Sequence, residues 1–181
     1  MTLWMVRHAQ PLVDAGTCYG QLDMPADVSA TLACAQALAK ILPPGISVAA
    51  SPLQRCEQLA QALLGLQTDL TIKKDARLQE MNFGAWEGQP WVDIARAELA
   101  AWTADFAAYR PGGSGESVAQ FMARVATAFD ELPRAADTLW ITHAGVMRAV
   151  HLISAGQRHI TSADQWPLAA PAYGQWCKLN L

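Results

Sequence analysis

The chain has 181 residues, of which 52% are hydrophobic and 16% are charged, a composition typical of a folded globular protein and not of a disordered one. This length fits one compact domain over residues 1–181. The formal net charge of −3 excludes a broad basic surface of the kind that binds nucleic acid or anionic lipid, so an anionic ligand would need a few arginines gathered in one pocket.

The first half of the chain alternates short apolar runs with helical patterns. Leu3–Val6 is a continuous apolar run that predicts a strand buried on both faces, and Pro11–Pro25 has the glycines and prolines of a loop. The apolar spacing predicts a helix over Ser29–Leu42, which Pro43-Pro44-Gly45 ends. The next predicted elements are a strand over Ile46–Ala50, a helix with Ser51 as N-cap and Pro52 at its first position that runs to about Leu64, and a strand over Leu70–Lys73.

The second half continues this alternation and ends in a loop-rich tail. Arg77–Pro90 is irregular, and a Trp- and Ala-rich helix is predicted from about Trp91 to Ala108. After the Gly-rich loop Arg110–Ser117, the predicted elements are an amphipathic helix from Ser117 to about Leu132, a strand over Thr138–Thr142, a helix to about Ala155 and a last strand over Trp176–Asn180. No repeat or change of composition marks a second domain. Strands alternating with helices predict a three-layer α/β/α sandwich with a mostly parallel central sheet.

The cysteines and the N-terminus favour a soluble, cytoplasmic protein. The four cysteines are widely spaced and form no CxxC pair, which favours reduced thiols. The first residues already belong to a predicted strand, which leaves no room for a signal peptide. No apolar run approaches the roughly 20 residues that span a bilayer, so we expect no membrane association. The sequence leaves the oligomeric state open.

Two predicted strands end directly in a histidine. One leads into Arg7-His8, and the other, Thr138–Thr142, leads into His143. In open α/β sheets, ligands bind beyond the carboxyl ends of the strands, so both histidines could meet in one crevice. Arg7 and Arg55 offer guanidinium groups that match phosphate oxygens. Taken alone, however, Arg55 would more simply be a solvated helix residue.

The other histidines and the aromatic residues are more simply explained as structural. His151 follows His143 by eight positions, and His159 follows His151 by eight. The chain has neither HExxH nor a paired carboxylate set, so no metal site is predicted. His151 and His159 are expected to be structural or surface residues. The aromatic residues that would suit stacking on a ligand are expected to be core or cover: Tyr19, Trp86, Trp91 and Trp102.

Four short motifs, in this order, resemble those of the histidine phosphatase (phosphoglycerate mutase-like) superfamily. They are Arg7-His8-Ala9-Gln10, Ser51-Pro52-Leu53-Gln54-Arg55, Leu78–Gly84 and Thr142-His143-Ala144-Gly145. The resemblance covers Trp4 to about Ile153 and implies the phosphoglycerate mutase-like fold. Ala9 departs from the family pattern, in which a glycine is usual here, and its methyl group could narrow the pocket or alter the local backbone.

The resemblance implies a metal-independent phosphomonoesterase without a cofactor. His8 would attack phosphorus and form a phosphohistidine. Arg7, Arg55 and His143 would hold the three equatorial oxygens, and so take the electrostatic role that a divalent metal has in other phosphatases. Glu80 would protonate the leaving alkoxide and later help to remove a proton from the attacking water. The expected partner is a small-molecule phosphate monoester.

A finer resemblance concerns the substrate. Cys18–Pro25, Phe83–Gly88 with Trp91 and Ile94, and the later Pro111–Ser117 are similar to segments of α-ribazole phosphatases. These enzymes remove the 5′-phosphate of α-ribazole, or of its corrinoid conjugate, in cobalamin biosynthesis. The match has two departures: Ser114-Gly115 is inserted into the Pro-Gly-Gly-Glu-Ser motif, and Ala33 replaces a glycine that is common in the first helix.

Three alternatives stay open. The superfamily contains broad-specificity phosphatases of sugar phosphates and nucleotides, which share parts of these motifs. A phosphoglycerate mutase would have a longer segment between its acid and its second histidine than the interval from Glu80 to His143, and a compact, open site admits water and favours hydrolysis. A phosphate-ester binding module that has lost catalysis has Ala9 as its only support.

Overall fold

A five-stranded sheet forms the centre of the molecule, for which a computed structural model describes residues 1–133 and 135–181. Its strand order is β3-β2-β4-β1-β5. The strands are β1 (Thr2–Arg7), β2 (Ser47–Ala50), β3 (Ile72–Lys74), β4 (Thr138–Thr142) and β5 (Trp176–Asn180). The first four pair in parallel, and β5 pairs antiparallel with β1 at the edge.

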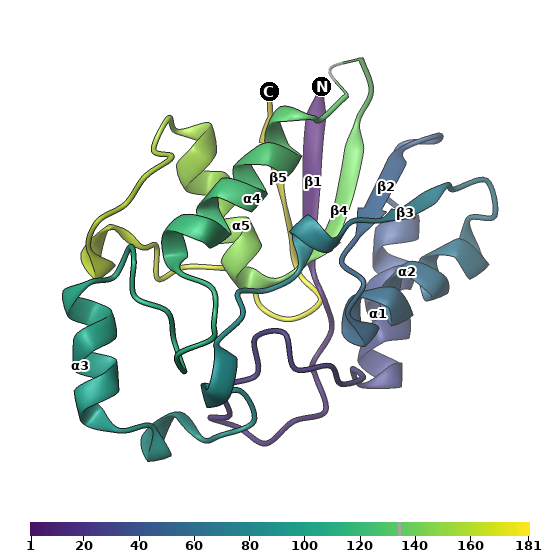
Figure 1. Cartoon of the computed structure of the whole chain (residues 1–181). Helices are drawn as coiled ribbons and strands as arrows, with labels where there is room; N and C mark the ends of the chain where they lie inside the picture. The colour runs from purple at the N-terminus through teal and green to yellow at the C-terminus, as the bar shows by residue number, and fades with distance from the viewer. Residues whose placement is uncertain (134) are drawn as a thin grey trace.

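Helices cover both faces of the sheet (Figure 1). On one face lie α1 (Val28–Ala39) and α2 (Gln54–Leu66), and on the other lie α4 (Val118–Asp130) and α5 (Ala144–Ser154). The helix α3 (Arg96–Ala104) lies away from the sheet (Figure 1). The short 3-10 turns are η1 (Ala76–Leu78), η2 (Gly84–Trp86), η3 (Trp91–Asp93) and η4 (Ala163–Gln165). None of the helices described is long and apolar enough to cross a membrane. The predicted three-layer α/β/α sandwich is confirmed.

Side chains of β1 alternate between two cores, because successive residues of a strand point to opposite faces. Leu3 and Met5 pack in the core that α4 and α5 share, whereas Trp4 and Val6 pack in the core that α1 and α2 share. The strand is therefore apolar at every position between its ends, as expected of a strand covered on both sides.

The start of α2 differs from the prediction. This helix begins at Gln54, and Leu53 precedes it without a side-chain cap, so the prediction of Ser51 as N-cap is wrong. The Ser51 hydroxyl lies 2.8 Å from Nε2 of His143, and the backbone N–H that it accepts from is that of Leu53, at 3.4 Å, which precedes the helix. The predicted start of α1 is also late by one residue, because Asp27 caps this helix through the N–H of Ala30 at 2.7 Å.

The single helix predicted over Trp91–Ala108 is wrong in extent. The segment begins with η3, continues through extended backbone at Ile94 and Ala95, and only then forms α3. Four of its apolar residues, Trp91, Ile94, Leu99 and Trp102, pack in a cluster around the buried Trp86, which Trp91 and Trp102 both contact. The apolar spacing therefore arises from this cluster and not from one helical face.

The carboxyl ends of β1 and β4 lie side by side at one edge of the sheet, the place where a parallel sheet forms its ligand crevice. Arg7 pairs with Thr142 in the register of these neighbouring strands, so His8 and His143 leave the sheet side by side. From β1 the chain continues to α1 on one face, and from β4 it continues to α5 on the other (Figure 1). Such a reversal of the winding direction is where parallel α/β sheets bind their ligands.

Candidate active site

His8 follows β1 and is only 1% exposed. Its Nδ1 lies 2.7 Å from the carbonyl oxygen of Ala9. Because a carbonyl oxygen only accepts, Nδ1 carries the proton and Nε2 keeps a lone pair. Burial, together with the nearby charge of Arg55, lowers the pKa of His8 from 6.5 to about 3. The ring is therefore neutral at neutral pH, which is the form a nucleophile needs.

The His143 ring packs against that of His8, with centroids 5.1 Å apart and planes at 60°. Its Nε2 lies 2.8 Å from Oγ of Ser51 and 3.5 Å from Sγ of Cys56. Its Nδ1 is buried and has no hydrogen-bond partner in the described chain. Burial lowers the pKa of His143 well below 6.5. If the Ser51 hydroxyl donates to Nε2, then Nδ1 carries the proton and is a free donor for a ligand.

Arg7 and Arg55 bring positive charge to the same crevice. Arg55 is fully buried and donates to the carbonyl oxygen of Gly20 at 2.6 Å, so the alternative of a solvated residue is wrong. Arg7 lies over the ring of Tyr173, 3.8 Å from its centroid, and donates to the carbonyl of Pro171 at 3.1 Å. Across residues 1–133 and 135–181 neither arginine has a carboxylate partner, and the Nε of each is buried and unpaired. A bound anion would offset the cost of the buried Arg55 charge and pair with the half-buried Arg7.

Glu80 lies two residues after η1 and contacts the start of α5. One carboxylate oxygen, Oε2, accepts from the N–H of Gly145 at 3.0 Å, and the other, Oε1, accepts from the N–H of Met81 at 3.0 Å. A Cβ atom at position 145 would overlap the carboxylate, so this close approach requires a glycine. Since Gly145 comes two residues after His143, the carboxylate is held near the second histidine of the crevice.

A cavity of about 360 Å³ opens beside Glu80 and Gly145. Neither His8 nor the two arginines of the crevice line it, so an ester bound at His8 would place only its alcohol portion there. The wall is mainly aromatic, from Phe83, Trp91, Trp102, Phe106, Phe121 and Trp166, and its polar side chains other than Glu80 are Thr17, Tyr19, Thr103 and Arg148. The cavity therefore suits a leaving group with a flat apolar part.

Ala9 has ordinary backbone geometry. The residue is 1% exposed, and its carbonyl oxygen holds the Nδ1 proton of His8. No described residue other than glycine has a positive φ, so position 9 does not require the conformational freedom of a glycine.

Residues that the sequence did not single out also lie around the crevice. The Tyr173 ring is 5.6 Å from that of His8, and its hydroxyl lies 2.8 Å from that of Tyr19. Nothing in the loop-rich tail signals this contact, which arises because β5 returns beside β1. Arg148 did carry a signal, as a lone arginine in the apolar helix after His143, and its Nε is buried and unpaired among the described residues.

The remaining histidines lie outside the crevice. His151 and His159 are exposed, as expected of surface residues. In the part of the chain that the structure describes, no three or more His, Cys, Asp or Glu side chains are grouped as a metal ion would require.

Comparison with known proteins places the chain in a family. The family model of the histidine phosphatase superfamily (branch 1) matches residues 3–179. The chain resembles TTHB049 from Thermus thermophilus, with 29% identity, a TM-score of 0.74, and coverage of 99% of this chain and 94% of that one. It also resembles a mycobacterial glucosyl-3-phosphoglycerate phosphatase, with 26% identity, a TM-score of 0.79, and coverage of 98% and 88%.

A second structure of that mycobacterial phosphatase, in complex with VO3, gives 25% identity and a TM-score of 0.80, with coverage of 99% of this chain and 90% of that one. No curated protein matches the chain.

Proposed function

The chain belongs to the histidine phosphatase superfamily and is a histidine-type phosphatase, and we propose that it hydrolyses phosphate monoesters through a phosphohistidine at Nε2 of His8. One observation carries this proposal. The lone pair of Nε2 is fixed by the Ala9 carbonyl, and it lies in a crevice with two arginines that have no carboxylate partner among the described residues. A phosphoryl group supplies both the electrophile and the anion that such a crevice needs.

In the first step, Nε2 of His8 forms a bond to phosphorus as the bond to the ester oxygen breaks. Arg7, Arg55 and the Nδ1–H of His143 bind the equatorial oxygens and stabilise the charge that spreads over them. Glu80, as the carboxylic acid, gives its proton to the departing alkoxide.

In the second step, water attacks phosphorus, and the Glu80 carboxylate takes a proton from it. The bond from phosphorus to nitrogen then breaks. Phosphate leaves, and His8 and Glu80 return to their starting forms.

The substrate that we propose is α-ribazole 5′-phosphate, or its corrinoid conjugate. The aromatic cavity beside Glu80 supports this choice, because the leaving alcohol must reach that acid and the benzimidazole ring of α-ribazole can stack on indole and phenyl rings. Stacking of a base on an aromatic side chain contributes about 1–3 kcal/mol. The substitution Trp91→Leu should therefore lower kcat/KM for α-ribazole 5′-phosphate by about tenfold and leave that for ribose 5-phosphate unchanged.

A second candidate is a phosphatase of sugar phosphates with an acidic leaving group. Arg148 favours it, because this arginine lines the cavity and has a buried Nε without a partner among the described residues. A carboxylate on the leaving group, as in the phosphoglycerate esters named for the mycobacterial neighbour, would pair with this guanidinium. Arg148→Gln would then lower activity on acidic esters alone.

The test is phosphate release, in EDTA, from α-ribazole 5′-phosphate beside sugar phosphates, nucleotides and phosphoglycerates. A preference for α-ribazole 5′-phosphate that disappears in His8→Ala, together with an acid-labile phosphohistidine in the native protein, supports the full proposal. Similar activity on all of these esters would support a phosphatase of broad specificity and contradict the assignment to cobalamin biosynthesis. Phosphate binding without release from any ester would instead favour a binding module, and Ala9→Gly would be the variant to test next.

A further inference from the structure

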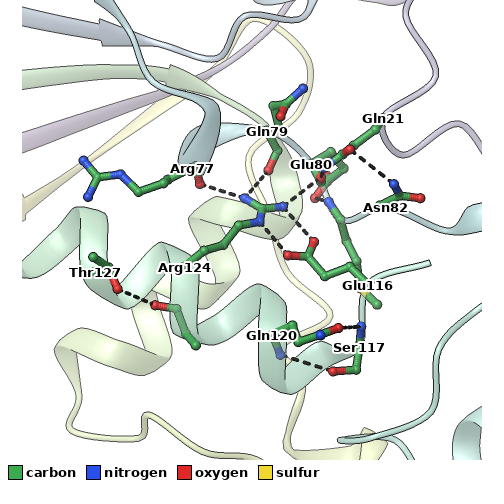
Figure 2. Close-up of polar contacts among 12 residues, drawn as sticks. Gln21, Arg77, Gln79, Glu80, Asn82, Glu116, Ser117, Gln120, Arg124 and Thr127 are labelled. Atoms are coloured by element: carbon green, nitrogen blue, oxygen red, sulfur yellow. Dashed lines mark hydrogen bonds and ion pairs between the residues drawn. The ribbon is translucent and has the colours of Figure 1, made fainter. Parts of the chain in front are cut away.

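Arg124 holds the backbone that carries Glu80 (Figure 2). From α4, its Nη1 donates to the carbonyl oxygens of Arg77 at 2.7 Å and Gln79 at 2.9 Å. Its Nη2 donates to the carbonyl oxygen of Glu80 at 2.9 Å. Arg124 thus binds the backbone of three of the four residues 77–80, the last of which is the acid Glu80.

The remaining donors of Arg124 bind Glu116 (Figure 2). Its Nε lies 2.7 Å from Oε1 and its Nη2 lies 2.9 Å from Oε2, a bidentate pair. The two side chains are 19% and 14% exposed, so the pair is largely shielded from water. All five N–H donors of the guanidinium therefore have a partner. The backbone N–H of Glu116 also donates to the backbone carbonyl oxygen of Asn82 at 2.8 Å. Glu116 therefore also anchors the chain on the C-terminal side of Glu80.

The neighbouring contacts tie the same segment to the rest of the site. The carbonyl of Leu78 accepts from the hydroxyl of Thr142, at 2.8 Å, and Thr142 directly precedes His143. The carbonyl of Glu80 accepts a second hydrogen bond from Nε2 of Gln21, at 3.1 Å. All four carbonyl groups of residues 77–80 are thus bound by side chains, and Arg124 supplies three of these contacts.

We infer that Arg124, held in place by Glu116, is a positioning residue that sets the Glu80 carboxylate against Gly145. This inference rests on the proposed role of Glu80 as general acid. Proton transfer requires hydrogen-bond reach to the leaving oxygen, and a catalytic group has to be held to within about 0.5 Å. Loss of the Arg124 contacts should therefore impair acid catalysis and leave the phosphate-binding residues of the crevice in place.

The variant that tests this is Arg124→Lys, because an ammonium keeps the charge but lacks the planar five-donor fork. Its kcat/KM is compared on ribose 5-phosphate, an alkyl ester, and 4-nitrophenyl phosphate, whose leaving group needs no proton. This parameter covers the steps up to phosphorylation of His8, so the shared second step does not enter. We expect a fall of about 10- to 100-fold for the alkyl ester and of less than about threefold for the aryl ester.

Glu80→Gln should show the same selective loss, and the double variant Glu80→Gln/Arg124→Lys should lose no more than Glu80→Gln alone. Equal losses on both esters in Arg124→Lys, beside a selective loss in Glu80→Gln, would overturn the inference and leave the proposed function standing. Additive losses in the double variant would also overturn the inference and leave the proposed function standing. A Glu80→Gln variant without ester selectivity would remove the acid role itself, and the inference with it.

The matched control is Arg158→Lys, the same substitution in an exposed bidentate pair with Asp130, whose contacts are 2.7 and 2.8 Å. This variant should keep both activities. If Arg124→Lys fails to fold, Glu116→Gln takes its place, because it keeps the shape of the partner and removes its charge. A selective loss on the alkyl ester in that variant supports the inference, and an equal loss or no loss overturns it.

Discussion

The amide of Gly145 and the carboxylate of Glu80 are in direct contact: the N–H donates to Oε2 at 3.0 Å, and a Cβ at position 145 would occupy the space of that carboxylate. The first turn of α5, which begins directly after the second histidine, therefore also fixes the acid. Substituting this glycine tests whether the position of Glu80 matters for activity.

Gly145→Ala should displace the Glu80 carboxylate and lower kcat/KM for alkyl phosphates by about 10- to 100-fold, with a smaller effect on 4-nitrophenyl phosphate. The measurement is the ratio of the two values in the variant and the native protein. Gly65→Ala is the matched control, since Gly65 lies in α2 with no atom within 4 Å of the added Cβ. It should stabilise the protein by about 0.5–1 kcal/mol and leave activity unchanged. An unchanged ratio in Gly145→Ala would contradict the assignment.

Ser51→Ala removes the hydroxyl that lies 2.8 Å from Nε2 of His143. We expect kcat to fall by about fivefold, because a hydrogen bond of about 1 kcal/mol no longer holds the tautomer that donates from Nδ1. Nitrogen-15 chemical shifts of the imidazole report the tautomer directly. Native protein should show a protonated Nδ1 on His143, and Ser51→Ala should show a mixture. A native ring protonated at Nε2 would refute this arrangement.

Arg55→Gln removes a buried charge that has no carboxylate partner in residues 1–133 and 135–181. We expect a loss of about 100- to 1000-fold in kcat, the usual effect of removing one donor to a transition-state oxyanion. Inorganic phosphate at 100 times its Kd should stabilise the native protein by about 2.7 kcal/mol, a gain that the variant should lack at the same concentration. Thermal unfolding with and without phosphate measures this. Arg158→Gln, at the exposed pair, is the control and should keep the phosphate effect.

Acid should destabilise the protein through His8. Its pKa falls from 6.5 in the unfolded chain to about 3 in the folded one, so in this window the unfolded chain binds a proton that the folded chain excludes. The free energy of unfolding therefore decreases as the pH falls from 6.5 towards 3, by up to about 1.4 kcal/mol per pH unit for this group. His143 adds to the slope in the same direction. The measurement is denaturant unfolding at several pH values from 7 to 4. The free energy of unfolding should change less steeply with pH in His8→Asn than in the native protein. The control variant is His151→Asn, at an exposed position. An equal dependence of the free energy of unfolding on pH in the native protein and in His8→Asn would argue against a neutral buried His8.

The sequence by itself determined the fold class and indicated the two histidines of the candidate site. Apolar runs that end in Arg7-His8 and in His143 indicate two central strands, because short continuous apolar runs are typical of strands covered on both faces. The carboxyl ends of parallel strands meet at one edge, so the meeting of these histidines followed from the pattern of strands and helices. Local signals of this kind depend on neighbours in the chain, and these are visible in the sequence.

Only the tertiary structure decided the surroundings of these residues. Ser51 has the local signature of a helix cap, yet its hydroxyl contacts the ring of His143, which follows another strand. The burial of Arg55, the contact of Tyr173 with His8 and the contacts of Arg124 with the Glu80 segment all join residues far apart in the chain. Periodicity and capping patterns describe the path of the backbone over a few residues. The partner of a buried polar side chain is set by how the layers pack, so it follows only once the whole sheet and its helices are in place.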